Sequence, residues 1–112
     1  MLKLAVNWEQ LREKVAMRPS EVLPQHRETI RQLVLEAGMA NPRIFGSVLH
    51  GDDKDGSDLD LLVDPAPMTS LLDVVRVQRL IETLIQVRVD LLTPGDLPPK
   101  FRDRVVAEAL PL

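Results

Sequence analysis

Three aspartates in the second half of the chain have the residue type and the spacing that metal-assisted chemistry on phosphates uses. Asp58 and Asp60 lie in residues 58–63, a predicted β-strand in which they alternate with Leu59 and Leu61. Residues two apart on a strand point the same way, so both carboxylates share one face. Aspartate is disfavoured inside strands, so the pair calls for an explanation. Asp90 lies on the polar face of a second alternating segment, residues 86–92, and a pairing of the two strands would bring three carboxylates together.

Such a cluster has one functional and one structural explanation. Carboxylate oxygens that leave coordination positions open suit Mg²⁺ or Mn²⁺, which keep water ligands and bind substrate phosphates. Two carboxylates on one strand face can also bracket a pair of cations about 3.5–4 Å apart. The structural alternative is a solvated strand face that binds nothing.

Gly46 and Ser47 are the second group of residues that could take part in chemistry. They follow Arg43-Ile44-Phe45, which predicts a short strand, and they precede a loop over residues 48–57 that is rich in Gly and Asp. A Gly-Ser turn lets backbone N–H groups and the Ser47 hydroxyl approach phosphate oxygens closely. The dipeptide alone is common, but its position before Asp58, Asp60 and Asp90 is much more specific.

The remaining elements must position these residues. Apolar spacing predicts helices over about 8–17, 21–37, 70–85 and 98–108 and strands over 43–45, 58–63, 86–92 and 110–112. Gly38 is a natural cap for the second helix, Asn41-Pro42 predicts a turn, and Ser70 with Asp73 forms a capping box. This order predicts an α/β (α+β) domain with a small mixed β-sheet and helices packed on it.

The helix over 70–85 is apolar on two sides. Val77 and Ile81 belong to one stripe, whereas Leu71, Leu72 and Val75 fall opposite. Such a helix either lies deep in a core or contacts a partner.

Composition narrows the class of protein. The chain has 112 residues, of which 45% are hydrophobic and 28% charged, with 14 basic and 17 acidic residues and no cysteine. These values are typical of one globular domain and exclude a disulfide scaffold or a thiolate site. A net charge of −3 argues against direct nucleic-acid binding through phosphate neutralisation. Neither a membrane-length apolar run nor a signal-peptide core is present, so a cytoplasmic protein is expected.

Together these pieces resemble the minimal nucleotidyltransferases (MNT type) of the DNA polymerase β superfamily. The family pattern is an apolar strand, Gly-Ser, a further glycine, Ser-Asp-x-Asp-Leu-Leu-Val, a helix, and an apolar strand with a third Asp. Here the matching segments are Ile44–Ser47, Gly51, Ser57–Val63, the helix from Ser70, and Val89–Leu92. The resemblance covers about residues 22–110 and implies a polymerase β-like core. We therefore expect a nucleotidyltransferase domain over 19–112, preceded by a helical extension over 1–18.

The resemblance also implies a reaction. Gly46, Ser47 and Ser57 would bind the nucleotide, and Asp58, Asp60 and Asp90 would be both catalytic residues and metal ligands. A hydroxyl would attack the α-phosphorus of a nucleoside triphosphate, ATP being the expected one, with two Mg²⁺ ions, or Mn²⁺ in their place. Many relatives have Ala-Arg before the loop glycine, whereas this chain has Leu49-His50, and imidazole cannot copy a bidentate arginine. Arg88 shares a face with Asp90 and could either bind phosphate or pair with the acidic cluster.

Members of this family are commonly antitoxins whose partner is a HEPN-type toxin encoded by a neighbouring gene. The resemblance therefore implies transfer of AMP to a hydroxyl of a partner protein. The alternative is an inactive binding module that neutralises its partner by steric masking. Modification of a small molecule such as an antibiotic is a third option, and self-association is open. An EF-hand fails, because Gly51 and Leu62 would occupy the positions of its first and last acidic ligands.

Overall fold

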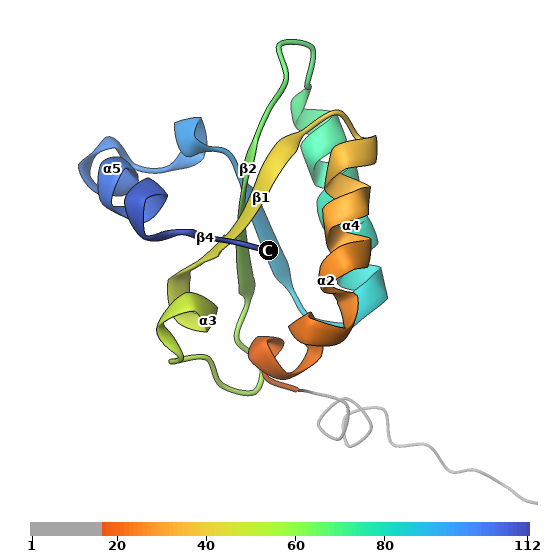
Figure 1. Ribbon diagram of the computed structural model, residues 1–112, viewed down its shortest axis with the longest axis vertical. Helices are drawn as coiled ribbons and strands as arrows, with labels where there is room; N and C mark the ends of the chain where they lie inside the picture. Colours follow the sequence, from red (N-terminus) through yellow and green to blue (C-terminus); the bar gives the residue numbers. More distant parts are fainter. Residues whose placement is uncertain (1–16) are drawn as a thin grey trace, which may run out of the picture.

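A computed structural model describes residues 17–112 as a four-stranded mixed sheet with helices on both sides (Figure 1). The predicted fold class is confirmed. In chain order the elements are α2 (Pro19–Glu36), β1 (Ala40–Phe45), α3 (Gly46–His50), β2 (Leu59–Asp64), α4 (Leu71–Ile85), β3 (Val89–Leu92), a 3₁₀ turn (Pro94–Asp96), α5 (Pro99–Glu108) and β4 (Leu110–Pro111). The predicted helix over 8–17, except its last residue, and most of the predicted extension over 1–18 lie outside the described residues.

The strands follow the order β3-β2-β1-β4. β1 is antiparallel to both β2 and β4, whereas β2 and β3 run parallel and are joined by α4. The two aspartate-bearing strands thus pair, which is the condition that the sequence analysis set for their carboxylates to come together. Residue 60 of β2 lies opposite residue 90 of β3, which fixes the geometry of the site.

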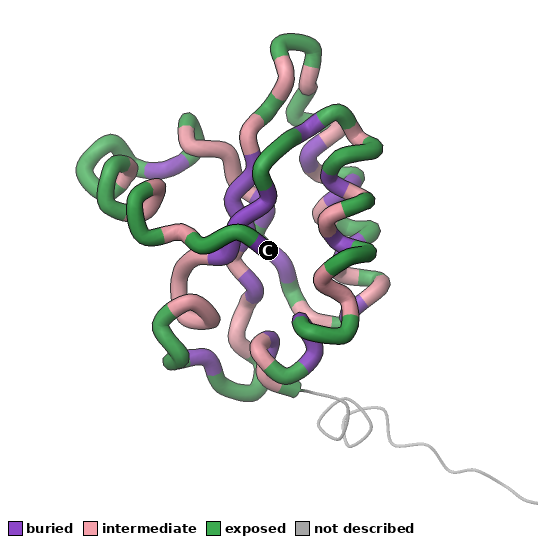
Figure 2. The backbone as a smooth tube through the Cα atoms, in the orientation of Figure 1, coloured by how far each residue is buried: buried purple, intermediate pink, exposed green. Residues whose placement is uncertain are grey.

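The main core lies between the sheet and the helices α2 and α4, which lie side by side on its right in Figure 1. The inward residues of β2 are fully buried there, as the alternation predicts, and Figure 2 shows the buried positions along the strands and on the inner faces of both helices. The core residues are Val22, Leu23, Ile30, Val34, Met39, Ile44, Leu59, Leu61, Val63, Val74, Val77, Ile81, Ile85, Val89, Leu91 and Leu112. No helix in residues 17–112 combines the length and the apolar character needed to span a membrane.

The helix ends agree with the capping signals. Gly38, at φ +83°, follows the end of α2, and its N–H donates to the Leu35 carbonyl at 3.0 Å. Ser70 and Asp73 form the predicted capping box of α4, with each side chain accepting the other residue's backbone N–H.

Besides shifts of one or two residues at element ends, three larger differences separate the structure from the sequence prediction. Asn41-Pro42 does not form a separate turn but lies within β1, where an irregular register and a φ of +56° at Asn41 absorb the local bend. The loop predicted over 48–57 is shorter, because its first residues belong to the helix α3. β3 begins at Val89 and not at residue 86, because Gln86 takes a left-handed conformation and caps α4.

Candidate active site

Two of the predicted site aspartates, Asp60 and Asp90, face each other across adjacent strands. They occupy directly opposed positions of the parallel pair β2–β3, and their inward neighbours Leu59 and Val89 fill the core on the other face of the sheet. Asp60 is half-buried and Asp90 is exposed. The structure therefore brings two carboxylates together at one solvent-accessible edge of the core.

Asp58 lies immediately before β2, one residue outside the strand in which we predicted it. Its carboxylate is near the guanidinium of Arg88, with Arg88 Nε 3.7 Å from Asp58 Oδ1. Arg88 directly precedes β3, and its carbonyl accepts the Leu59 N–H at 2.8 Å. Of the two uses considered for Arg88, the structure has the charge pair.

The backbone of Gly46 lies directly against the Asp60 side chain. It follows Phe45, the β1 residue that lies opposite Asp60, and has φ +73°. A Cβ added at Gly46 would lie 2.2 Å from Asp60 Oδ2, closer than real atoms approach. Only glycine allows both this backbone conformation and the close approach of the carboxylate. The Gly-Ser motif and the Asp-x-Asp motif thus meet at one point in space.

Burial and neighbouring charges favour the protonated form of Asp60. Burial, then the negative charges of Asp90 and Asp58, and finally a hydrogen bond with the Asp90 carboxyl group raise the pKa of Asp60 to about 6. Like charges this close disfavour simultaneous ionisation, and a bound cation relieves their repulsion. Clusters of this kind occur at functional sites more often than elsewhere.

The donor set fits a hard divalent cation in chemistry. The oxygens of Asp60 and Asp90 are adjacent, and their mutual repulsion supplies the electrostatic drive to bind Mg²⁺ or Mn²⁺. Within residues 17–112, however, no three acidic, histidine or cysteine side chains are already grouped to hold one ion. Asp58 is the predicted third ligand, and it lies beside Arg88 instead.

Comparison with known proteins identifies the family. A model described as a nucleotidyltransferase domain matches residues 23–112. The chain belongs to this nucleotidyltransferase family. Among its relatives, a candidate protein adenylyltransferase of Methanocaldococcus jannaschii is 36% identical over 78 residues, which cover 70% of this chain and 84% of that protein. The protein adenylyltransferase MntA of Thermococcus cleftensis is 30% identical over 89 residues, which cover 80% and 87% of the two chains.

Solved structures agree with this assignment. One described as a candidate minimal nucleotidyltransferase is 40% identical, has a TM-score of 0.75, and is matched over 83% of this chain and 95% of that one. A toxin–antitoxin crystal structure with AMP-PNP shares the fold, with a TM-score of 0.65 at 19% identity over 75% of this chain and 69% of that one. The predicted membership among minimal nucleotidyltransferases and the predicted enzyme class are confirmed.

The other predicted residues of this nucleotidyltransferase have varied surroundings. Ser47 lies in the first turn of α3 beside Gly46. Ser57 closes the loop, because its hydroxyl accepts the Lys54 N–H at 2.8 Å. His50 is turned to α5, with Nε2 3.4 Å from Glu108 Oε2.

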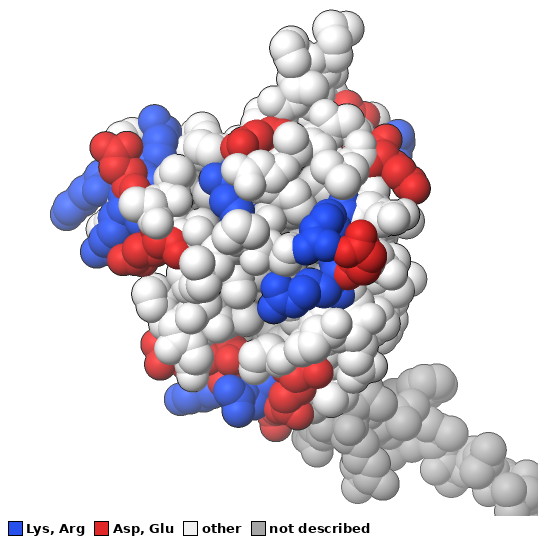
Figure 3. All heavy atoms as spheres, in the orientation of Figure 1, with Lys and Arg blue, Asp and Glu red and all other residues white. Residues whose placement is uncertain are grey.

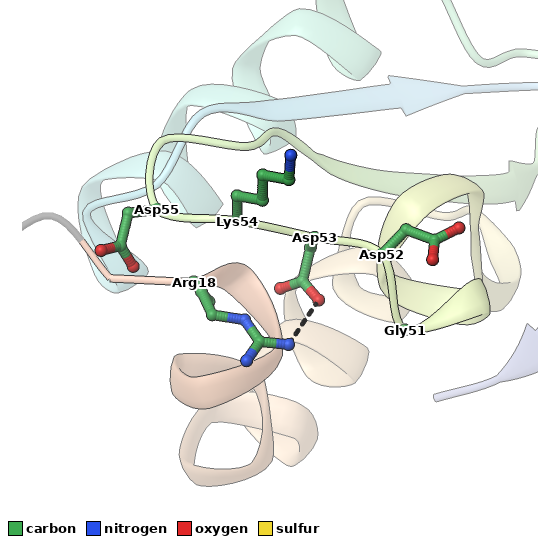
Figure 4. A pocket seen from close by; sticks show the side chains of 6 residues that line it. All are labelled: Arg18, Gly51, Asp52, Asp53, Lys54 and Asp55. Carbon is green, nitrogen blue, oxygen red and sulfur yellow. Dashed lines mark hydrogen bonds and ion pairs between the residues drawn. The ribbon is translucent and has the colours of Figure 1, made fainter.

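Asp53 has a role that the sequence analysis missed. It is only 4% exposed, accepts the Ser20 N–H at 2.9 Å and pairs with Arg18 at 3.3 Å, so it caps the start of α2 (Figure 4). Although burial raises its pKa, these hydrogen bonds and the arginine charge hold the pKa of Asp53 below its usual value. An open pocket of about 760 Å³ lies here, lined by Arg18 and residues 51–55. Asp53 therefore anchors the loop that leads to the site. No residue near Asp53 in the sequence indicated its distant partners, Arg18 and Ser20.

The surface carries two further features. Lys100, Arg102 and Arg104 give α5 a basic character, seen in blue at the left of Figure 3, although acidic side chains lie among them. Near the start of α4, Met68, Leu71 and Leu72 are 90%, 77% and 63% exposed. The second apolar side of this helix is therefore on the surface and not deep in a core.

Proposed function

We propose that the protein transfers AMP from ATP to a hydroxyl group of a partner protein, and that the partner is a HEPN-type toxin that it neutralises. One observation carries the proposal: Asp60 and Asp90 are opposed on adjacent strands, with Gly46 against Asp60 and Asp58 at the strand entrance. This arrangement puts carboxylates, whose oxygens suit Mg²⁺, next to a Gly-Ser turn whose backbone N–H groups suit phosphate oxygens.

Asp58, Asp60 and Asp90 would hold Mg²⁺, with two ions in the proposal and Mn²⁺ as a substitute. Burial first, and then the charges of Asp90 and Asp58, raise the pKa of Asp60, and a bound cation would stabilise the ionised carboxylate against both effects, which supports this assignment. When bound, the metal ions would supply positive charge to the oxygens of the triphosphate. Asp58 would exchange its contact with Arg88 for a contact with the metal.

The remaining residues would bind the substrate and move one proton. Backbone N–H groups of Gly46 and Ser47 and the hydroxyls of Ser47 and Ser57 would hold the triphosphate. The acceptor oxygen forms a bond to the α-phosphorus, the bond from that phosphorus to the bridging oxygen of the β-phosphate breaks, and pyrophosphate leaves. The Asp90 carboxylate accepts the proton of the acceptor hydroxyl and returns it to solvent.

Two observations favour a protein as acceptor. The relatives matched over most of their length carry the name protein adenylyltransferase, and the fold recurs in toxin–antitoxin structures, one of them with AMP-PNP. The exposed side chains of Met68, Leu71 and Leu72 form an apolar area of the kind that protein partners cover. ATP and Mg²⁺ are available in the cytoplasm, where we expect the reaction to occur.

A binding module without catalysis is the second candidate. It is favoured by His50, which is paired with Glu108 and leaves the phosphate site without the arginine that many relatives have. In this case the protein would neutralise its partner by covering it.

Intact mass spectrometry of the co-expressed neighbouring gene product distinguishes the two functions. The partner is incubated with ATP, Mg²⁺ and either the wild-type protein or the Asp58→Asn/Asp60→Asn variant. The matched control is Asp52→Asn/Asp55→Asn, which removes two charges from exposed positions of the adjacent loop. We expect a mass gain of one or more AMP units with wild type and control, and none with the site variant.

Three other results of this experiment would contradict parts of the proposal. Stable complexes with all three proteins and no mass gain would replace catalysis by steric masking. A mass gain that survives Asp58→Asn/Asp60→Asn would refute the site assignment. A chain that neither binds nor modifies the neighbouring product would refute the toxin partner.

A further inference from the structure

β3, the strand that carries Asp90, is short and lies at the edge of the sheet. It comprises four residues and, within residues 17–112, pairs on one side only, with β2, in the strand order β3-β2-β1-β4. Successive backbone N–H groups of a strand point to opposite sides, so those of Val89 and Leu91 point away from β2. An edge strand of this kind has half of its hydrogen-bonding groups without a strand partner.

Helix α4 supplies the missing partners through two side chains. Glu82 Oε2 accepts the Val89 N–H at 3.0 Å, and Gln78 Oε1 accepts the Leu91 N–H at 3.0 Å. Gln78 and Glu82 are four residues apart, so they lie one above the other on the same helix face. Both side chains are half-buried beside the core-facing residues of α4. The two bonds hold β3 at the residues immediately before and after Asp90.

Electrostatic repulsion between Asp60 and Asp90 acts on β3 at this point. Asp60 and Asp90 are directly opposed, and like charges at opposed positions weaken the pairing of two strands. The repulsion pushes the outer strand away from the sheet, because β2 is held on both sides and β3 is not. The side-chain bonds from α4 oppose this displacement.

We propose that Gln78 and Glu82 are positioning residues that clamp β3 and thereby hold Asp90 opposite Asp60. The effect on catalysis rests on the proposed function, in which Asp90 accepts the proton of the acceptor hydroxyl. The clamp requires an oxygen acceptor at each position and does not require the charge of Glu82. Gln78→Glu and Glu82→Gln keep that acceptor, whereas Gln78→Ala and Glu82→Ala remove it.

The kinetic test compares these variants in the AMP transfer assay, with Arg79→Ala on the exposed side of α4 as control. Loss of both acceptors should lower kcat about 10- to 100-fold, as expected for a catalytic group displaced by about 1 Å, while the KM for ATP changes less than about twofold. Gln78→Glu, Glu82→Gln and Arg79→Ala should retain a rate near that of wild type. A purely stabilising role would lower the melting temperature of the alanine variants and leave kcat unchanged at a temperature where they are folded.

Amide hydrogen exchange tests the clamp without reference to activity. In the Gln78→Ala/Glu82→Ala variant the amides of Val89 and Leu91 should exchange faster, and so should that of Asp90, which faces β2. Unchanged protection of Asp90, or a wild-type kcat in this variant, would overturn the inference. If the double variant does not fold, each single alanine variant loses one bond and must show the same effects to a smaller degree. A wild-type chain that transfers no AMP would count against the proposed function, and exchange at Asp90 would still decide the clamp.

Discussion

Replacing Asp60 by asparagine should make the protein more stable at neutral pH, although it removes a site residue. The asparagine side chain would be nearly the same size, could donate a hydrogen bond to Asp90 and would carry no charge. The reason is the pKa of Asp60, raised from 3.8 to about 6 chiefly by burial and then by Asp90 and Asp58. A carboxyl group with a raised pKa opposes folding at every pH where it is ionised.

The sign and size follow from this shift. Below about pH 4 Asp60 is protonated in both the folded and the unfolded chain, so it does not reduce stability. As the pH rises from about 4 to about 6, the unfolded chain releases the proton that the folded chain retains, and stability falls. The full shift corresponds to about 3 kcal/mol. Because Asp60 is only half-buried, solvent screening reduces the expected gain of Asp60→Asn to about 1–2 kcal/mol above pH 7.

Urea unfolding of wild type and Asp60→Asn at pH 4 and pH 7.5 measures this gain. At pH 7.5 the variant should unfold at higher urea and melt about 5–10 °C higher, and at pH 4, close to the unfolded pKa of 3.8, only a small part of this difference should remain. Asp55→Asn, at an exposed loop position, is the control and should change little at either pH. A variant that is less stable at pH 7.5, or equally stabilised at both pH values, would refute the electrostatic argument.

Three further outcomes are expected. Gly46→Ala should destabilise the fold by about 1–3 kcal/mol more than Gly51→Ala in thermal melts, because both glycines have φ +73° but only a Cβ at Gly46 meets Asp60; equal losses would contradict this contact. Asp53→Asn should lower the free energy of unfolding by about 1–3 kcal/mol at pH 7 by weakening the cap on α2. Because the pKa of Asp53 is lowered in the folded protein, the difference in unfolding free energy between wild type and Asp53→Asn should shrink as the pH falls below about 4. A difference that stays constant with pH in urea titrations would show that the charge of Asp53 is not the cause. Millimolar Mg²⁺ should raise the melting temperature of wild type by a few degrees and that of Asp58→Asn much less, and an equal rise would refute the metal assignment.

Local sequence signals predicted most of the elements. The patterns of residues 58–63 and 86–92 indicated two strands with aspartates on one face, whereas their parallel pairing, which brings Asp60 and Asp90 together, is seen only in the structure. The Ser70–Asp73 capping box predicted the start of α4 to within a residue. These signals are short-range, and the chemistry that produces them acts within one turn or one strand.

The missed features depend on contacts between distant parts of the chain. Helix α3 has five residues, too few for a helical period to be recognised. Asp53 was one acid in a run of acids, and only the fold brings it to the start of α2, 33 residues earlier. The bonds from Gln78 and Glu82 could not be expected before β3 was known to be the edge strand.

In their first halves the strands β2 and β3 contribute one set of residues to the core and the alternate residues, Asp60 and Asp90, to the site. Leu59 and Leu61 are fully buried on one side of Asp60, and Val89 and Leu91 are buried around Asp90. The two carboxylates meet only after the chain has passed through α4 and returned beside β2, so a nascent or truncated chain that ends before residue 92 has neither a closed core nor a site. The proposed AMP transfer would therefore be a direct reporter of completed folding. Selection for that transfer in a mutant library would at the same time select for intact packing of these strands.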